Sequence, residues 1–188
     1  MIPSELPSDI PSGGFLFLRH GRTAANARDL ICGRTDLPLD ATGRLQAAAA
    51  AVALARFGIA RIVTSPLTRA RQTAAAVAAP LGLVPELVPG LAERDWGAWE
   101  GQPRAGLRRA ETPPGGESPA AFRARIRAAF AALSFARPLL IVAHSGTERE
   151  IHALLSTAPH RRRGNAEAVL WSPGAEGWIC HEAFKPGG

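Results

Sequence analysis

The chain has 188 residues, of which 46% are hydrophobic and 20% charged, a composition that fits one globular domain and excludes disorder throughout. The longest apolar run, 47–55, is too short to cross a membrane, so no membrane partner is expected. The net charge of +6 comes almost entirely from arginines, but these are scattered and lack interleaved aromatic residues, so no nucleic-acid partner is expected either.

Hydrophobic patterning predicts strands that alternate with amphipathic helices. Between flexible tails over 1–13 and 185–188, the expected elements are a strand at 15–18, a helix at 41–57, a strand at 62–64, a helix at 67–80, a stretch rich in proline and glycine at 84–116, a helix after Ser118, a strand at 139–143, a helix at 147–155 and closing strands at 168–172 and 178–184. Strands that are apolar on both faces are typical of a parallel sheet covered by helices. The expected fold is one domain over 14–184, a three-layer α/β/α sandwich with a mostly parallel central sheet.

Capping residues and apolar spacing support the helices. Asp40 is expected to cap the first helix and Gly58 to end it, and Pro66 is expected in the first turn of the second. The side chains expected to face the core are Leu45, Ala48 and Val52 in the first helix, Phe122, Ile126, Phe130 and Leu133 in the third, and Ile151, Leu154 and Leu155 in the fourth.

Polar side chains follow three of the predicted strands. Arg19 and His20 come directly after the first, Arg69 lies one turn into the helix after the second, and His144 and Ser145 follow the third. Parallel strands bring their carboxyl ends to one edge of the sheet, and the helices that begin there favour an anion. We therefore expect two imidazoles and two guanidinium groups to surround one phosphoryl group.

A metal site is the alternative for His20 and His144. Two guanidinium groups nearby would repel a dication, and the usual carboxylate or cysteine ligands are missing from the motif, so no metal and no cofactor are expected. Cys32 and Cys180 fit neither a disulfide framework nor a zinc pattern and are expected to be reduced thiols. The remaining histidines, expected to have no catalytic role, are His152, which is expected off the apolar stripe of its helix, His160 and His181.

Six segments of the sequence form one ordered series of motifs. They are LRHGRTAAN at 18–26, GRTDLPLD at 33–40, SPLTRARQTA at 65–74, LAERDWGAWEG at 91–101, PGGES at 114–118 and VAHSG at 142–146. In this order the series resembles the histidine phosphatase superfamily, in its phosphoglycerate-mutase-like branch. The resemblance implies that His20 is the nucleophile that becomes phosphorylated and that Glu93 is the proton donor. It also implies that Arg19, Arg69 and His144 hold the phosphoryl oxygens, that Asn26 lines the same pocket, and that Thr23 is the motif threonine.

The chain departs from the family pattern after His144. Many members have two glycines and a hydrophobic residue before arginine, whereas this chain has Ser145, Gly146, Thr147 and Glu148. Ser145 is a candidate substrate contact that adds a hydroxyl to the phosphate pocket or narrows it. Glu148 is expected to act as ordinary capping charge near a helix start or to alter substrate preference.

A phosphohistidine mechanism can be argued from these residue types. A neutral imidazole can attack phosphorus, and Arg19 and Arg69 should lower the pKa of His20 by like-charge repulsion. The same two cations would stabilise the transferring phosphoryl group. Glu93 would protonate the leaving group and later activate water, with Asp95 as the alternative acid. A purely structural reading has Glu93 paired with Arg94 on a surface loop.

Several other side chains have two readings. Trp96 and Trp99 either wall the pocket or anchor their loop to the core, and the anchoring role is favoured. The arginines that either grip the non-reacting part of an acidic substrate or form a solvated surface are Arg34, Arg104, Arg108 and Arg109.

The expected activity is hydrolysis of a small-molecule phosphate monoester, with α-ribazole 5′-phosphate and sugar phosphates as candidate substrates. The short stretch at 101–115 favours an open site and hydrolysis over a cofactor-dependent phosphoglycerate mutase, the second candidate. A non-catalytic phospholigand-binding module is the third. The start of the chain does not resemble a secretion signal, so a cytoplasmic monomer or homodimer is expected.

Overall fold

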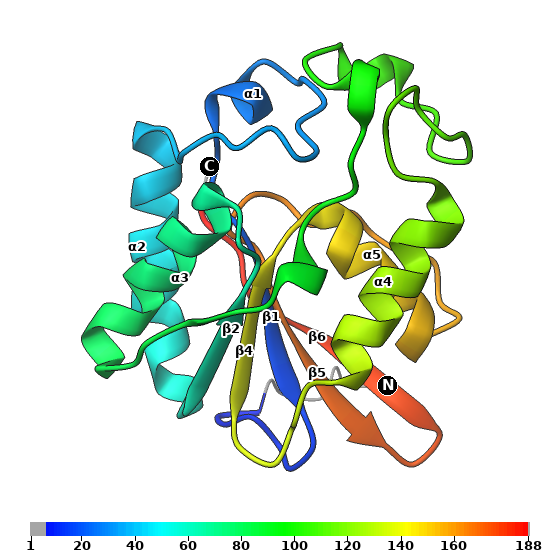
Figure 1. Ribbon diagram of the computed structural model, residues 1–188. Helices are drawn as coiled ribbons and strands as arrows, with labels where there is room; N and C mark the ends of the chain where they lie inside the picture. Colours follow the sequence, from blue (N-terminus) through cyan, green and yellow to red (C-terminus); the bar gives the residue numbers. More distant parts are fainter. Residues whose placement is uncertain (1–6, 188) are drawn as a thin grey trace.

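The computed structural model describes residues 7–187 and has a six-stranded sheet at its centre (Figure 1). The strand order is β3-β2-β4-β1-β5-β6. Four parallel strands, β1 (Phe15–Arg19), β2 (Arg61–Thr64), β3 (Glu86–Leu87) and β4 (Leu139–Ala143), are followed by β5 (Ala168–Gly174) and β6 (Gly177–Phe184), which are antiparallel. The mostly parallel sheet predicted from the apolar strands is confirmed.

Helices cover both faces of this sheet (Figure 1). The α-helices are α1 (Ala24–Ala27), α2 (Ala41–Leu54), α3 (Thr68–Leu81), α4 (Pro119–Ala131) and α5 (Ser145–Leu155). Helices α2 and α3 share one buried cluster with the sheet, and α4 and α5 share the other. This is the expected three-layer α/β/α sandwich. Among residues 7–187, no helix is long and apolar enough to cross a bilayer.

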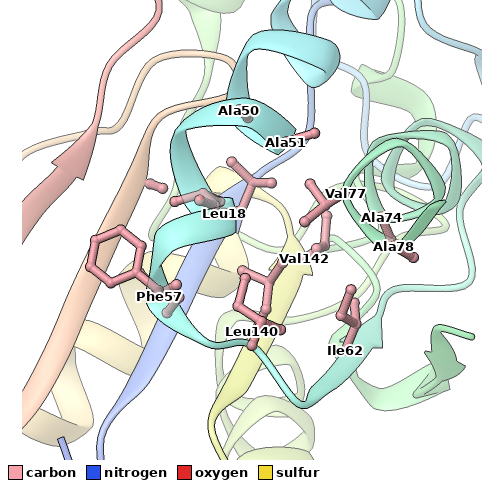
Figure 2. Close-up of a cluster of buried hydrophobic side chains, with 14 of the residues drawn as sticks. Leu18, Ala50, Ala51, Phe57, Ile62, Ala74, Val77, Ala78, Leu140 and Val142 are labelled. Atoms are coloured by element: carbon pink, nitrogen blue, oxygen red, sulfur yellow. The ribbon is translucent and has the colours of Figure 1, made fainter. Parts of the chain in front are cut away.

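The strand side chains alternate between the two cores. In β1, Leu16 and Leu18 pack toward α2 and α3, whereas Phe15 and Phe17 pack toward α4 and α5. Figure 2 shows the first of these clusters, with Leu18 and Val142 from the sheet beneath the alanines of the two helices. Both faces of each central strand are therefore buried, as the unbroken apolar runs predicted.

The predicted inward stripe of α2 is wrong. Leu45 is 72% exposed and Val52 is 81% exposed, and Ala48 is exposed as well. The buried side chains of the helix are instead Ala47, Ala50, Ala51 and Leu54. An alanine run contains several apolar stripes at once. The close approach of α3 selects the stripe with the smallest side chains, which spacing alone does not reveal.

The ends of the elements match most of the capping signals. Asp40 caps α2, where its carboxylate accepts from Gly43 N at 2.7 Å, and Gly58 ends the following 3-10 turn (Ala55–Phe57) with a φ of 60°. Pro66, however, lies before α3 and not in its first turn, because Leu67 is the N-cap residue. Helix α5 begins at Ser145, two residues earlier than predicted.

Two further expectations change. The predicted tail at 1–13 is partly packed, because Ile10 is 7% exposed and joins the α2–α3 core; positions 1–6 of that tail, like position 188 of the other, lie outside the described residues. His152, expected off the apolar stripe of α5, is buried with its ring 5.5 Å from that of Trp171. The 84–116 stretch holds β3 and three 3-10 turns, Pro89–Leu91, Gly97–Trp99 and Arg104–Gly106.

Candidate active site

Two histidines and two arginines meet at the carboxyl edge of the parallel strands. Arg19 is the last residue of β1 and His20 follows it, His144 follows β4, and Arg69 lies in the first turn of α3 after β2. All four are at most 4% exposed, and the rings of His20 and His144 are 5.1 Å apart between centroids. Strand order places β1 and β2 on either side of β4, which is why residues distant in the chain share one site.

The hydrogen bonding of His20 fixes its tautomer. Nδ1 lies 2.7 Å from the carbonyl oxygen of Gly21, which can only accept, so Nδ1 carries the ring proton. The lone pair of the neutral ring therefore lies on Nε2. Burial is the largest cause that holds the pKa of His20 well below 6.5, and the charges of Arg69 and Arg19 lower it further. At neutral pH the imidazole is unprotonated, which is the state that attack on phosphorus would require.

His144 is held by Ser65. Its Nε2 lies 2.7 Å from Ser65 Oγ, and the same oxygen accepts from Leu67 N at 3.3 Å. If the hydroxyl donates to Nε2, Nδ1 of His144 carries the proton and is a donor for a phosphoryl oxygen. Burial, then Arg69 and His20, lower the pKa of His144 well below 6.5. The His144 ring is therefore neutral at neutral pH.

The two guanidinium groups are fixed from behind by carbonyl oxygens. Arg19 Nη1 donates to Arg163 O at 2.6 Å, and Arg69 donates to Gly33 O at 2.7 Å and Thr35 O at 2.9 Å. Within residues 7–187, the Nε atoms of both arginines and Nδ1 of His144 are buried without a protein partner. Burial lowers the pKa of Arg19 to about 9, which leaves the group charged at neutral pH. The site thus offers fixed cations and free donors to an anion.

Glu93 lies at the mouth of the same site. Its Oε2 accepts from Gly146 N, in the first turn of α5, at 2.9 Å, and its Oε1 accepts from Arg94 N at 2.8 Å. Its backbone carbonyl accepts from Arg34 Nε at 2.9 Å and from Arg125 Nη2 at 3.3 Å. The carboxylate is therefore held at the positive N-terminal end of α5. The amide that holds it belongs to Gly146, which lies two positions after His144 in the sequence.

The structure contradicts the expected pairing of Glu93 with Arg94, whereas Asp95 stays the alternative acid. Arg94 does not pair with the Glu93 carboxylate, because its guanidinium donates to the carbonyls of Glu117, Arg109 and Glu111 at 2.9, 2.6 and 2.6 Å. Asp95 accepts from Gly97 N at 2.9 Å and so shapes the next turn. Of the two acids, Glu93 is the one that contacts the helix beginning at the second histidine.

Thr23 and Asn26 are linked to His20 through Asn165. They form a reciprocal capping box at α1, in which Thr23 Oγ1 accepts from Asn26 N and Asn26 Oδ1 accepts from Thr23 N, both at 3.2 Å. Asn165 donates to Asn26 Oδ1 at 3.0 Å and to His20 O at 3.2 Å. Ser145 is the first residue of α5 and is 9% exposed, and Arg34 is exposed at the rim.

Further arginines gather around the opening. Arg104 forms an ion pair with Asp29 at 3.2 Å. Burial is the main cause that lowers the pKa of Arg19, and like-charge repulsion from Arg162 and Arg104 lowers it further. After burial, neighbouring arginines also lower the pKa of Arg109 and Arg162. We call the following four residues the cationic rim: Arg104, Arg109, Arg149 and Arg162. Arg108, by contrast, lies 5.1 Å over the ring of Trp99.

The two tryptophans stack on each other, and only Trp96 is buried. Trp96 is 7% exposed and lies under the guanidinium of Arg94, at 4.2 Å, and its ring stacks on that of Trp99 at 6.2 Å. The favoured anchoring role is therefore supported for Trp96.

Sequence reasoning missed the residues that support the site from behind. Besides Ser65, they include Thr73, whose Oγ1 accepts from Gly21 N at 3.0 Å, and the segment 160–167, which contacts Arg19 and His20. The loop at 160–167 carries no motif, so the sequence gives no local signal of its contacts. Ser65 and Thr73 lie inside the recognised segment 65–74, and Glu100 lies inside 91–101, but a motif does not show which groups its side chains contact. Glu100 binds the backbone of Arg34 and Thr35 at 2.6 and 2.7 Å.

Possible metal ligands and thiols are scattered over the part of the chain that the structure describes. No three histidine, cysteine, aspartate or glutamate side chains there are grouped so that they could hold a metal ion. Cys32 and Cys180 are free thiols, and burial raises the pKa of both, to about 11 for Cys180. Neither is an activated nucleophile.

Comparison with known proteins adds the family. The family model described as "Histidine phosphatase superfamily (branch 1)" matches residues 15–178. Agropine synthesis reductase of Rhizobium rhizogenes is 34% identical over 81% of this chain and 37% of its own length, and the chain spans about a third of the length of the first curated relatives it matches. The probable phosphoglycerate mutase GpmB of Yersinia enterocolitica is 33% identical over 78% of this chain and 76% of its own.

A solved structure shows the same fold. The structure of a mycobacterial glucosyl-3-phosphoglycerate phosphatase complexed with VO3 superposes with a TM-score of 0.77 at 28% identity, over 89% of this chain and 96% of that one. The relatives thus include proteins named as phosphatases and as mutases.

Proposed function

Because this chain belongs to the histidine phosphatase superfamily, we propose that it hydrolyses a small-molecule phosphate monoester through a phosphohistidine on His20. The observation that carries the proposal is the bond from His20 Nδ1 to Gly21 O, which leaves the lone pair on Nε2 in a buried site with two guanidinium groups. This is the arrangement that a phosphoryl acceptor requires.

The first step transfers the phosphoryl group to the enzyme. His20 Nε2 attacks phosphorus while Arg19, Arg69 and His144 bind its peripheral oxygens, and the bond from phosphorus to the ester oxygen breaks. The departing oxygen takes its proton from the Glu93 carboxyl group.

The second step returns the enzyme to its starting state. Water attacks the phosphohistidine, its proton passes to the Glu93 carboxylate, and the bond from Nε2 to phosphorus breaks to release orthophosphate. The site residues supply positioning and fixed charge in both steps, and this electrostatic contribution is worth about 3 kcal/mol for each well-placed donor.

Hydrolysis is favoured over mutase chemistry by the short segment 101–115. A mutase must exclude water while it holds a phosphorylated intermediate, whereas this segment is tied down beside Arg94 through the carbonyls of Arg109 and Glu111. The cationic rim favours a substrate whose non-reacting part is acidic, and sugar phosphates and α-ribazole 5′-phosphate are the first candidates to assay.

The test is a panel of phosphomonoesters assayed with chelator present and scored by kcat/KM. We expect release of orthophosphate without a bisphosphate primer, and an acid-labile, base-stable phosphoryl group that is trapped on the wild type but not on His20→Ala. Near-normal hydrolysis by His20→Ala would refute the nucleophile. Dependence on a primer would identify a mutase, and phosphate binding without any turnover would identify a binding module.

A further inference from the structure

The segment 160–167 supports the phosphoryl pocket from behind. The carbonyl of Arg163 accepts the 2.6 Å hydrogen bond from Arg19 Nη1. Two residues further on, Asn165 Nδ2 and Ala166 N both donate to the carbonyl of His20, at 3.2 and 3.1 Å. A shift of this segment would therefore move the groups that hold both residues.

Glu148 holds this segment from the opposite side. It lies on α5, one turn after His144, and its side chain is 1% exposed. His160 Nε2 contacts Glu148 Oε2 within hydrogen-bond distance, and Arg163 Nε lies 3.7 Å from Oε1. A buried carboxylate is costly without a cation and hydrogen-bond donors beside it, and the guanidinium of Arg163 and the ring of His160 lie next to Glu148.

Helix capping does not explain Glu148. Gly146 N, in the first turn of α5, already donates to Glu93, and the Glu148 carboxylate is directed to His160 and Arg163. Glu148, expected either as ordinary capping charge or as a residue that alters substrate preference, is thus an internal contact between α5 and the segment 160–167.

We propose that Glu148 is a positioning residue for phosphoryl binding. By holding the Arg163 side chain, it fixes the Arg163 carbonyl, and that carbonyl orients the guanidinium of Arg19. The inference rests on the proposed function only in that Arg19 binds a phosphoryl group, and it holds whether or not hydrolysis follows.

The first test is the affinity for orthophosphate, measured by calorimetry. Glu148→Gln keeps the shape of the side chain but removes its charge, and we expect the dissociation constant to rise about tenfold. The matched control is Glu150→Gln, which removes a carboxylate from the same helix that pairs at 3.3 Å with Arg123. We expect that control to stay within about twofold of wild type. In assays of turnover, KM should rise more than kcat falls.

A double-mutant cycle with Arg19 separates positioning from general destabilisation. If Glu148 acts through Arg19, adding Glu148→Gln to Arg19→Gln should change the dissociation constant by less than about twofold. A full tenfold further loss would overturn the proposal, as would an unchanged dissociation constant in Glu148→Gln alone.

A second variant covers the case in which Glu148→Gln does not fold. Arg163→Gln retains the backbone carbonyl but loses the ion pair, and its side chain is 11% exposed. We expect the same loss of orthophosphate affinity and the same absence of effect in the Arg19→Gln background. Unchanged affinity in Arg163→Gln would equally overturn the proposal. Since binding is measured without turnover, an inactive protein would refute the proposed function and leave this result readable.

Discussion

Glu93 and Gly146 meet across the active site, where Glu93 Oε2 accepts a 2.9 Å hydrogen bond from Gly146 N. A Cβ atom built on Gly146 would collide with Glu93 Oε1. Because Gly146 has no side chain, it leaves the space that the carboxylate of Glu93, the proposed proton donor, occupies. Its role is close approach, since Gly146 lies in ordinary helical backbone.

Gly146→Ala should consequently displace the Glu93 carboxylate while the helix remains formed. We expect kcat/KM to fall about a hundredfold, because a shift of about 1 Å in a catalytic group has effects of this size. The control is Gly106→Ala, where an added Cβ meets nothing within 4 Å. Circular dichroism and steady-state kinetics on both proteins make the comparison, and equal activity of the two would contradict this role.

Glu93→Gln should slow the enzyme in a way that depends on the leaving group. An amide cannot donate the proton that an alkoxide needs, so alkyl phosphates should lose about a hundredfold or more in kcat. Nitrophenyl phosphate should lose much less, because its phenolate leaves without protonation. The measurement is kcat on both substrate types, and equal losses would argue against general-acid chemistry.

The activity should persist at acidic pH. His20 must be neutral to attack, and burial with Arg69 and Arg19 holds its pKa well below 6.5. The fall of kcat/KM on the acid side should therefore begin well below pH 6.5. A pH profile with nitrophenyl phosphate measures this limit, and a midpoint at or above 6.5 would show that the imidazole is not depressed in the folded enzyme.

His20 and His144 should both make the free energy of unfolding depend on pH. Their folded-state pKa values lie below 6.5, so between the folded pKa and 6.5 the unfolded chain binds more protons, and the free energy of unfolding falls as the pH falls. Each contributes at most about 1.4 kcal/mol per pH unit. Denaturant titrations between pH 6.5 and 5 should give a shallower slope for His144→Asn than for wild type, and parallel slopes would count against a neutral buried His144.

Two leucines of α2 provide a matched test of the packing. Leu54 is fully buried and Leu45 is 72% exposed. We expect Leu54→Ala to lower the free energy of unfolding by about 3 kcal/mol, and Leu45→Ala to change it by less than about 0.5 kcal/mol. Urea denaturation of both variants measures the difference. A larger loss of unfolding free energy in Leu45→Ala than in Leu54→Ala would mean that the predicted stripe with Leu45 faces the core after all.

The sequence by itself determined the features that local chemistry controls. Unbroken apolar runs located β1 and β4, Asp40 and Ser118 marked helix starts through their caps, and the spacing of Phe122, Ile126 and Phe130 defined the buried face of α4. The polar residues after the strands were also readable, because parallel strands necessarily end at one edge of a sheet.

Only the tertiary structure decided which groups contact one another across long stretches of chain. The position of Glu93 depends on its approach to Gly146, and the orientation of the Arg19 guanidinium depends on a carbonyl 144 residues away. The buried stripe of α2 likewise depends on its neighbour α3. These contacts are set by packing, and packing is a property of the assembled layers, which no periodicity along the chain encodes.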